Sequence, residues 1–244
     1  MFGRQNDIIV HLPSCIDSNH LPNYNLNRKG QHARTRILSV FAYHHPDITW
    51  APLLAPITAV FLHYMSEIDA YECLLILTSH SYKFLSQTEI QYQSLIGSFR
   101  SLLRRHCRST YEVLVKTCPT IFEQWIWILF EYLPFRYLVP IIDCLLVEDM
   151  KILIRFLMTF LNIFVHSQSS KTRFSFFRRK RSSHRSLKFP DLVQFIQQLD
   201  IPIEKLFKHA FSIHNLQRKE IFRAIQVGHI HQQRSIKQDF SFSD

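Results

Sequence analysis

Residues 122–164 read FEQWIWILFEYLPFRYLVPIIDCLLVEDMKILIRFLMTFLNIF, and this stretch decides the fold class. Its apolar residues recur at the spacing of an α-helix, so we expect helices at 122–133, 137–147 and 149–165. Pro134 stops the first of them, because a proline cannot continue a helix without losing a backbone hydrogen bond. Three consecutive apolar helices joined by short links indicate an all-α domain.

Helix starts near this stretch carry a shared signal. The pattern Ser/Thr-x-x-Glu occurs at Ser86–Glu89, Ser109–Glu112 and Thr120–Glu123. In such a capping box the hydroxyl accepts a hydrogen bond from a free backbone N–H, and the glutamate reaches back to another. We therefore expect a helix to begin at each of these three places.

The rest of the chain divides into three parts by the same reasoning. Residues 1–30 are rich in proline, asparagine and serine, and they predict an irregular lead-in. Residues 31–228 are expected to form one multi-helix domain of about nine helices, in which first-turn prolines restart the late helices. Residues 229–244 are expected to be a polar tail after a last helix that ends near residue 226. We find no strand pattern and no internal repeat.

Composition excludes several classes of protein. The chain has 244 residues, of which 47% are hydrophobic, so it is too apolar to be disordered and long enough for a sizeable core. Its 4 glycines are scattered and cannot form the phosphate-binding loop of a nucleotide-binding enzyme. No apolar run reaches the roughly 18 residues of a membrane span. The 5 cysteines, far apart and without a C-x-x-C pair, are typical of reduced thiols in a cytosolic protein.

Metal binding and covalent catalysis find little support in the residue spacing. There are 14 histidines, but the close pairs His44-His45 and His229-x-His231 have no cysteine or carboxylate at ligand spacing. No G-x-S-x-G nucleophile motif is present. We therefore expect no metal, no cofactor and no self-contained enzyme.

Positive charge is concentrated in one segment. The chain carries 29 Lys and Arg against 19 Asp and Glu, a formal net charge of +10. Most of that excess lies between residues 171 and 188, a stretch without an acidic residue, so the remaining chain is close to neutral. We define residues 167–189 as the basic loop. Its cations are Lys171, Arg173, Arg178, Arg179, Lys180, Arg181, Arg185 and Lys188.

Three interpretations of the basic loop stay open. Its phenylalanines, Phe174, Phe176 and Phe177, could enter a membrane interface while the cations hold anionic headgroups, at about 1 kcal/mol for each basic residue. The same composition could bind nucleic-acid phosphates or serve as a nuclear import signal. It could also be a solvated insertion without a partner. We favour the membrane surface over nucleic acid.

Taken together, three stretches resemble a known family. They are residues 12–65 with the junction HHPDITW, the quoted residues 122–164, and residues 201–221, which read IPIEKLFKHAFSIHNLQRKEI. These stretches are similar to the TBC domain, the all-helical fold of Rab GTPase-activating proteins. They are most similar to the Skywalker type, in which a TBC domain precedes a TLD domain. The resemblance covers residues 12–226.

The resemblance carries an implication for catalysis. Active TBC domains use an arginine finger in an I-x-x-D-x-x-R motif and a glutamine finger in a Y-x-Q motif; these stabilise charge on the transferring phosphoryl group and position the attacking water. Here Asp17 matches the aspartate, but the arginine position falls on His20. Trp50 replaces the tyrosine and Pro52 replaces the glutamine. The resemblance therefore implies a domain without catalytic fingers, and we expect no enzyme activity by this route.

The Skywalker type also implies a phosphoinositide site. It draws on cations near the start of the domain and in the stretch that matches Lys205–His214. Lys208 is present there, whereas His214 stands where the family has an arginine. We name eight candidate lipid-binding residues from this stretch and the basic loop. They are Lys171, Arg173, Arg178, Arg179, Lys180, Arg181, Lys208 and His214.

The resulting hypothesis is a non-catalytic adaptor in vesicle and membrane trafficking, cytoplasmic and peripheral on vesicle or plasma membranes. Its expected partners are a small GTPase of the Rab or Arf type and an anionic phosphoinositide membrane surface. The alternatives are a GTPase activator that works by an unusual mechanism, and a nucleic-acid or nuclear protein that acts through the basic loop. Against the family pattern, the chain is expected to lack the first helices of the domain and the TLD domain. A second copy or another protein would then complete its core.

Overall fold

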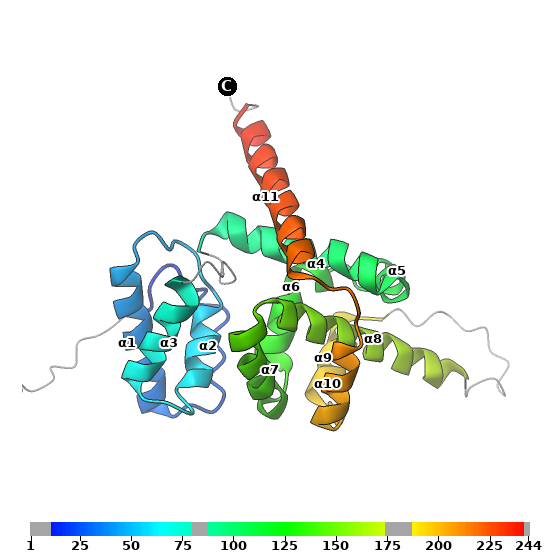
Figure 1. The fold of residues 1–244 in the computed structure, drawn as a ribbon, viewed down its shortest axis with the longest axis horizontal. Helices are drawn as coiled ribbons and strands as arrows, with labels where there is room; N and C mark the ends of the chain where they lie inside the picture. The colour runs from blue at the N-terminus through cyan, green and yellow to red at the C-terminus, as the bar shows by residue number, and fades with distance from the viewer. Residues whose placement is uncertain (1–10, 80–86, 174–186, 242–244) are drawn as a thin grey trace, which may run out of the picture. The chain divides into compact units, whose positions relative to one another are not determined.

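The computed structural model describes residues 11–79, 87–173 and 187–241, and these residues form eleven α-helices and one short π-helical turn, without a strand (Figure 1). The predicted all-α class is confirmed. The described residues form more helices than the nine expected. The chain divides into two compact units, Met1–Tyr92 and Gln93–Asp244, where the sequence predicted one domain.

The first unit contains three helices that pack on one another: α1 (Arg28–His44), α2 (Leu54–Phe61) and α3 (Glu67–Ser79). All of α2 is buried, because its only polar side chain is Thr58. That hydroxyl donates to a backbone carbonyl of its own helix, so the helix buries no unpaired polar side chain.

Polar side chains fix the irregular segment before α1. Asn27 Oδ1 accepts a hydrogen bond from Gly30 N–H at 2.9 Å, and this cap makes the helix begin at Arg28, slightly before the end of the expected lead-in. The buried Arg34 donates from Nη1 to Pro22 O at 2.9 Å. The lead-in is therefore irregular but held against α1.

The second unit is organised around α8 (Lys151–Arg173), whose residues 152–161 are all buried. Several elements pack directly on it: α5 (Arg108–Thr117), η1 (Ile128–Tyr132), α7 (Phe135–Glu148), α9 (Phe189–Gln197) and α10 (Ile203–Phe211). The second unit also contains α6 (Ile121–Trp127), α11 (Arg218–Ser241) and most of α4 (Glu89–His106), whose first residues belong to the first unit. A long apolar helix surrounded by others is what the quoted stretch predicts.

The capping boxes that fall on described residues do not form. Ser109 lies inside α5, and Glu112 Oε1 instead accepts from Arg108 Nε at 3.0 Å. Thr120 does precede α6, but its hydroxyl makes no capping hydrogen bond. The box Ser86–Glu89 begins outside the described residues, although α4 starts at its glutamate.

Two long helices continue beyond their expected ends. α8 reaches Arg173, so residues 167–173 of the expected basic loop are helical. α11 reaches Ser241, so the expectation that the last helix ends near residue 226 is wrong, and the helix continues through most of the predicted polar tail. The extension of α8 contains no proline or glycine, and that of α11 contains only Gly228; a helix that has already started can add polar residues at little cost.

Membrane-span criteria are not met by any single helix within residues 11–79, 87–173 and 187–241. One bent pair, Arg108–Thr117 with Ile121–Tyr132 at 108°, meets them by length and composition when the two are combined.

Tyr137, on α7, holds the linker between α9 and α10. Its hydroxyl lies 2.9 Å from Ile201 O and 3.2 Å from Leu199 O, and it accepts from Ile201 N at 3.1 Å. We expect Tyr137→Phe to lower the free energy of unfolding by about 2 kcal/mol, because buried backbone groups lose their partner. Urea denaturation measures this beside Tyr43→Phe, whose ring is 82% exposed and should change nothing. A loss no larger than that of Tyr43→Phe would contradict the assignment.

Candidate functional site

The first predicted motif lies in a turn stabilised by Asp17. Ile16 N donates to Pro13 O at 3.1 Å, which closes the turn just before the aspartate. Asp17 Oδ1 then accepts from Asn19 N at 2.9 Å, and Oδ2 lies 2.7 Å from His20 Nδ1. The carboxylate therefore orders both the turn and the imidazole at the arginine-finger position.

The second motif lies beside the first. Ala51 N donates to Cys15 O at 2.7 Å, which joins the two segments through their backbones. Trp50 N donates to Gln87 O at 3.1 Å, while the Trp50 Nε1 is buried without a hydrogen-bond partner. Pro52 is buried. The structure thus brings the segments of all four predicted finger positions together within the first unit.

Of the predicted lipid-binding residues, only Lys208 and His214 have described side chains. Lys171 and Arg173 lie in the last turns of α8, and nothing is described of their side chains. Lys208 is exposed on α10, and His214 is exposed in the turn that follows. Four further candidates fall outside the described residues: Arg178, Arg179, Lys180 and Arg181. As a lipid site, these residues stay a prediction.

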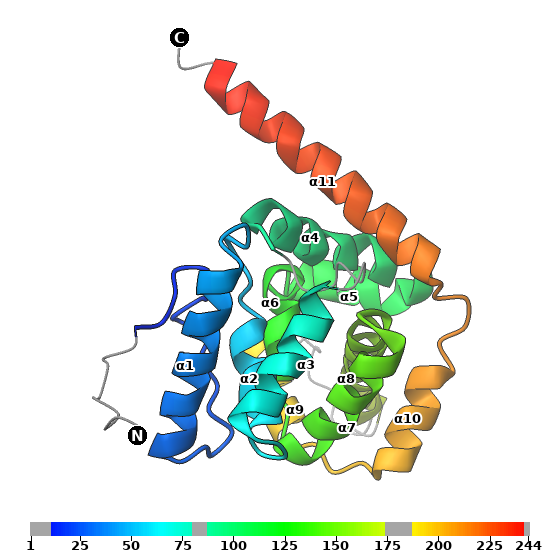
Figure 2. The same ribbon diagram turned by 60° about the vertical axis from the view of Figure 1, so that its left-hand side comes forward.

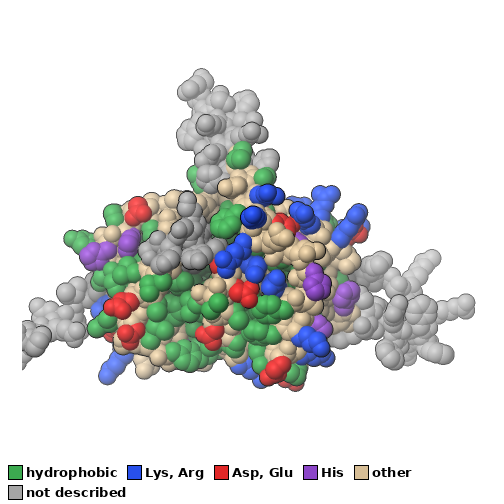
Figure 3. All heavy atoms as spheres, viewed as in Figure 1, with side chains coloured by type: hydrophobic (Ala, Val, Ile, Leu, Met, Phe, Trp, Pro, Cys, Tyr) green, Lys and Arg blue, Asp and Glu red, His purple; other side chains and the backbone are tan. Residues whose placement is uncertain are grey.

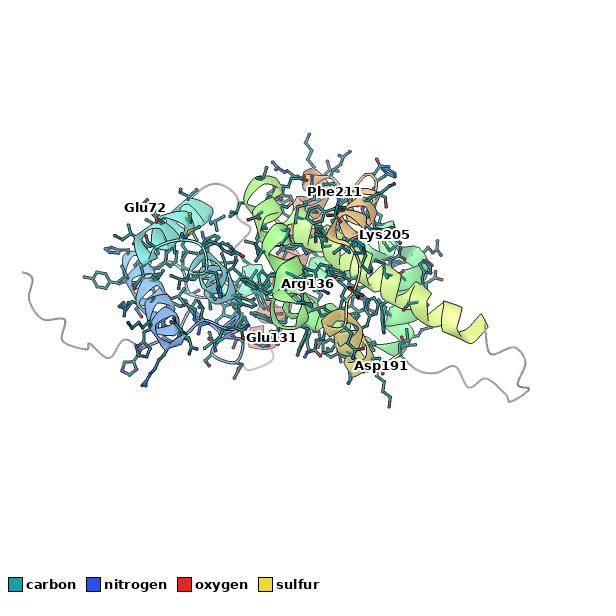
Figure 4. All side chains as sticks on the ribbon, turned by 90° about the horizontal axis from the view of Figure 1, so that it is seen from below. Glu72, Glu131, Arg136, Asp191, Lys205 and Phe211 are labelled. Atoms are coloured by element: carbon teal, nitrogen blue, oxygen red, sulfur yellow. The ribbon has the colours of Figure 1, made fainter. Side chains whose placement is uncertain are left out.

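A cationic cluster that sequence reasoning missed surrounds the start of α8. We call it the Arg155 cluster, and it comprises Lys151, Arg155 and Arg218 with the carboxylates of Glu148 and Asp149. The Arg155 side chain is only 10% exposed, and its Nε is buried without a hydrogen-bond partner. Its guanidinium carbon lies 5.1 Å from the centre of the ring of Phe211, at the end of α10 (Figure 4).

The carboxylates of the cluster neutralise its cations incompletely. Glu148 Oε2 lies 2.8 Å from Lys151 Nζ but 3.9 Å from Arg155 Nη1. Asp149 Oδ2 lies 2.7 Å from Arg218 Nε, an ion pair in which the N–H is not directed at the oxygen. Three cations therefore share two carboxylates, and the most deeply buried cation has the most distant partner.

Burial shifts the pKa of both buried members of the cluster toward their neutral forms. Burial lowers the pKa of the Arg155 guanidinium, and the negative charge of nearby Glu148 opposes this shift. Burial also raises the pKa of the Asp149 carboxyl, although the hydrogen bond from Lys151 N–H and the charge of Arg218 act to lower it. A charge that is desolvated and weakly paired attracts an oppositely charged ligand. For Arg155, such a ligand is an anion.

Metal binding and thiol chemistry receive no support from the described part of the chain. No group of three or more His, Cys, Asp or Glu side chains there could hold a metal ion. The five cysteines are free, and burial raises the pKa of each thiol, which keeps it protonated and weakly reactive.

A family model described as the Rab-GTPase-TBC domain matches residues 4–168, more than half of the chain and a range that includes both finger segments and Arg155. The chain belongs to the Rab-GTPase-TBC domain family. The resemblance to TBC domains found in the sequence is therefore confirmed.

Curated relatives place this TBC protein near the Skywalker type. It is 33% identical over 220 residues to the GTPase-activating protein skywalker of Drosophila melanogaster, covering 88% of this chain and 37% of the relative. It is 28% identical over 230 residues to TBC1 domain family member 24 of Xenopus laevis, covering 90% of this chain and 39% of that protein. The chain thus spans less than half the length of either relative.

Solved structures agree with the TBC assignment. The crystal structure of the TBC domain of Skywalker/TBC1D24 from Drosophila melanogaster matches with a TM-score of 0.79 and 32% identity, over 91% of this chain and 72% of that one. The same domain in complex with inositol(1,4,5)triphosphate matches with a TM-score of 0.74 and 30% identity, over 87% and 75%. The predicted TBC fold is confirmed.

One signal in the TBC sequence could have identified the Arg155 cluster. Arg155 is the single charged residue in the apolar run 152–164, and arginine is rarely buried unless something pairs with it. Two other members of its surroundings, Phe211 and Arg218, could not be found in the same way, because they lie far away in the sequence and only the fold brings them near the start of α8.

Proposed function

We propose that this TBC protein is a non-catalytic adaptor that binds an anionic inositol phosphate headgroup at the Arg155 cluster. The observation that carries the proposal is the buried guanidinium of Arg155, whose Nε has no partner and whose carboxylate neighbour is 3.9 Å away. Support comes from the related Skywalker TBC domain, whose structure was solved in complex with inositol(1,4,5)triphosphate.

The cluster has the chemistry that a phosphate requires. Arginine presents several N–H donors in a plane, and charge-assisted hydrogen bonds to phosphate are among the strongest in proteins. Lys151 lies one turn before Arg155 on the same helix, so the two cations share a face of α8. Arg218, half-exposed at the start of α11, adds a third positive charge.

Calorimetric titration of the whole chain with inositol(1,4,5)triphosphate tests this site. We expect saturable binding that weakens steeply between 50 and 500 mM salt, because the contacts are ionic. Sodium sulfate at the same ionic strength is the control for a general anion effect. An equal response to sulfate, or no heat of binding, would reject the proposed headgroup site.

The finger segments support the non-catalytic part of the proposal. Proline has no side-chain donor, so Pro52 cannot position a water molecule, and its side chain is buried. His20 is hydrogen-bonded to Asp17 and lacks the length and the permanent charge of an arginine finger. The adaptor would therefore engage a small GTPase of the Rab or Arf type without accelerating hydrolysis, as a peripheral protein on vesicle or plasma membranes.

We expect the chain to leave GTP hydrolysis by Rab proteins at its intrinsic rate, because both catalytic groups are replaced. Single-turnover assays over a panel of Rab proteins measure this, with a TBC domain that retains both fingers as the positive control. Arginine-finger catalysis accelerates hydrolysis about 10³-fold or more. Any Rab stimulated more than tenfold would therefore favour a GTPase activator with an unusual mechanism.

A further inference from the structure

α11 carries exposed side chains on the side turned away from α4. Its inner side packs on α4, where Ile221 is buried and Gly228 lies so close to Ser94 that an added Cβ would meet the serine backbone oxygen at 3.1 Å. Beyond this contact the helix extends well past the other helices of its unit (Figures 1 and 2). On the opposite side, Lys219, Arg223 and Ile230 are exposed.

The outward side of α11 combines cations with exposed apolar groups. Lys219 and Arg223 are exposed and lie four positions apart, so they share a face. Phe222 is 37% exposed and Ile230 is 49% exposed, and helical spacing places both near that face. A soluble helix would normally present polar residues there, so this mixture indicates a surface that meets a partner.

Acidic side chains around the base of α11 are engaged elsewhere. Glu220 turns toward α4, where its oxygens lie 3.0 Å from His106 Nε2 and 3.0 Å from Arg105 Nε. Asp149 is paired with Arg218. Figure 3 shows Lys and Arg side chains gathered at the base of α11 and over the adjoining helices. The local surface is therefore cationic after its ion pairs are formed.

We propose that the outward face of α11 binds the surface of a lipid bilayer that contains anionic phospholipids such as phosphatidylserine. The cations would lie among the headgroups, and Phe222 and Ile230 would enter the interface, as in amphipathic helices that lie on membranes. A projecting, convex helix suits a flat bilayer, whereas single-stranded nucleic acids are bound in grooves with stacked aromatic rings.

This second site goes beyond the proposed function, because the Arg155 cluster recognises one headgroup and α11 responds to the charge of the whole surface. The two sites also differ in their ligands. Vesicles of phosphatidylcholine and phosphatidylserine lack the inositol phosphate headgroup that the cluster recognises, and soluble inositol(1,4,5)triphosphate offers no bilayer to α11. The variants on α11 then separate its contribution from that of the basic loop.

Vesicle co-sedimentation of the whole chain tests the α11 site. Each Lys or Arg near an anionic leaflet strengthens binding about fivefold, so Lys219→Gln with Arg223→Gln should weaken binding to phosphatidylserine vesicles about 30-fold. The charge-matched control, Arg28→Gln with Lys29→Gln on α1, should bind like the parent. Ile230→Ser should weaken binding by a smaller factor without altering its salt dependence.

The results separate the two proposals. Loss of vesicle binding with intact inositol(1,4,5)triphosphate binding, in a variant that keeps the parent's melting temperature, supports the α11 site. Unchanged vesicle binding in the α11 double variant overturns it, even where the cluster binds its ligand. Loss of single-stranded RNA binding or of self-association in that variant, with vesicle binding retained, also overturns it and assigns the face to that partner.

Discussion

Arg155→Met is expected to weaken binding of inositol(1,4,5)triphosphate about 100-fold. The side chain is nine-tenths buried, its Nε has no partner, and its carboxylate neighbour Glu148 is already engaged by Lys151 at 2.8 Å. Removing one partner of a desolvated charge pair typically costs about 2–5 kcal/mol of binding free energy. Calorimetric titration of parent and variant at one ionic strength measures the difference.

The same variant, Arg155→Met, should keep or gain thermal stability although it loses affinity for the ligand. Methionine fills most of the arginine volume and removes a buried, weakly paired charge. Glu148 is one-third exposed and keeps its ion pair with Lys151, so the change leaves no uncompensated charge buried. We therefore expect an unchanged or higher melting temperature. That result would show that the lost binding reflects the missing guanidinium and not unfolding.

Arg136→Met is the matched control. Arg136 lies on the neighbouring α7 (Figure 4) and is largely exposed, and its Nη2 donates to Leu199 O at 2.9 Å. This change removes an equal charge, so binding should fall only slightly through screening. Equal losses in both variants would mean that net charge alone holds the ligand. A marked fall in the melting temperature of Arg155→Met would make the arginine structural.

The fold was largely predictable because the signals that define these helices are local. Pro134 ends the apolar segment at the expected place, and Pro190 and Pro202 lie at the starts of α9 and α10. The predicted capping boxes were wrong where one local interaction competed with another. Arg108, adjacent to the Ser109 capping motif, pairs with Glu112 one turn along the helix, so the glutamate does not reach back to a free N–H.

The candidate sites were predictable to different degrees for the same reason. Asp17 and His20 are close in sequence, so a motif can place them together, and the structure joins them at 2.7 Å. Sequence spacing connects Glu148, Lys151 and Arg155, whereas Phe211 on α10 and Arg218 on α11 reach the Arg155 cluster only through the fold. Composition drew attention to the basic loop instead, because a dense run of cations is conspicuous in a sequence whereas a single buried arginine is not.

Asp149→Gly is expected to raise both the stability of the chain and its affinity for inositol(1,4,5)triphosphate. Asp149 has φ 63° and ψ −165°, a backbone conformation essentially restricted to glycine, and such strain costs about 1–3 kcal/mol. Its buried carboxyl also has a pKa raised by desolvation. A group whose pKa is raised on folding destabilises the native state above that pKa, so at neutral pH its removal is favourable.

Three effects oppose this gain in stability. Lys151 N–H gives up a 3.2 Å hydrogen bond to Asp149 Oδ1, and the half-exposed Arg218 loses its ion pair, which is worth about 1 kcal/mol or less. Glycine also gains entropy in the unfolded chain. We therefore expect a net increase of about 1 kcal/mol in the free energy of unfolding, measurable by urea denaturation.

Affinity should rise about tenfold in Asp149→Gly, because a negative charge a few ångströms from the ligand is removed and Arg218 is released to the phosphates. Asp149→Asn separates the two causes, since it removes the charge and keeps the strained backbone. It should match the affinity of the glycine variant and gain less stability. Its stability advantage over the parent should also shrink as the pH is lowered from 7 toward 4, because the parent carboxyl becomes protonated. Equal or weaker binding in both variants would show that Arg218 does not contact the ligand and that the cluster is smaller than proposed.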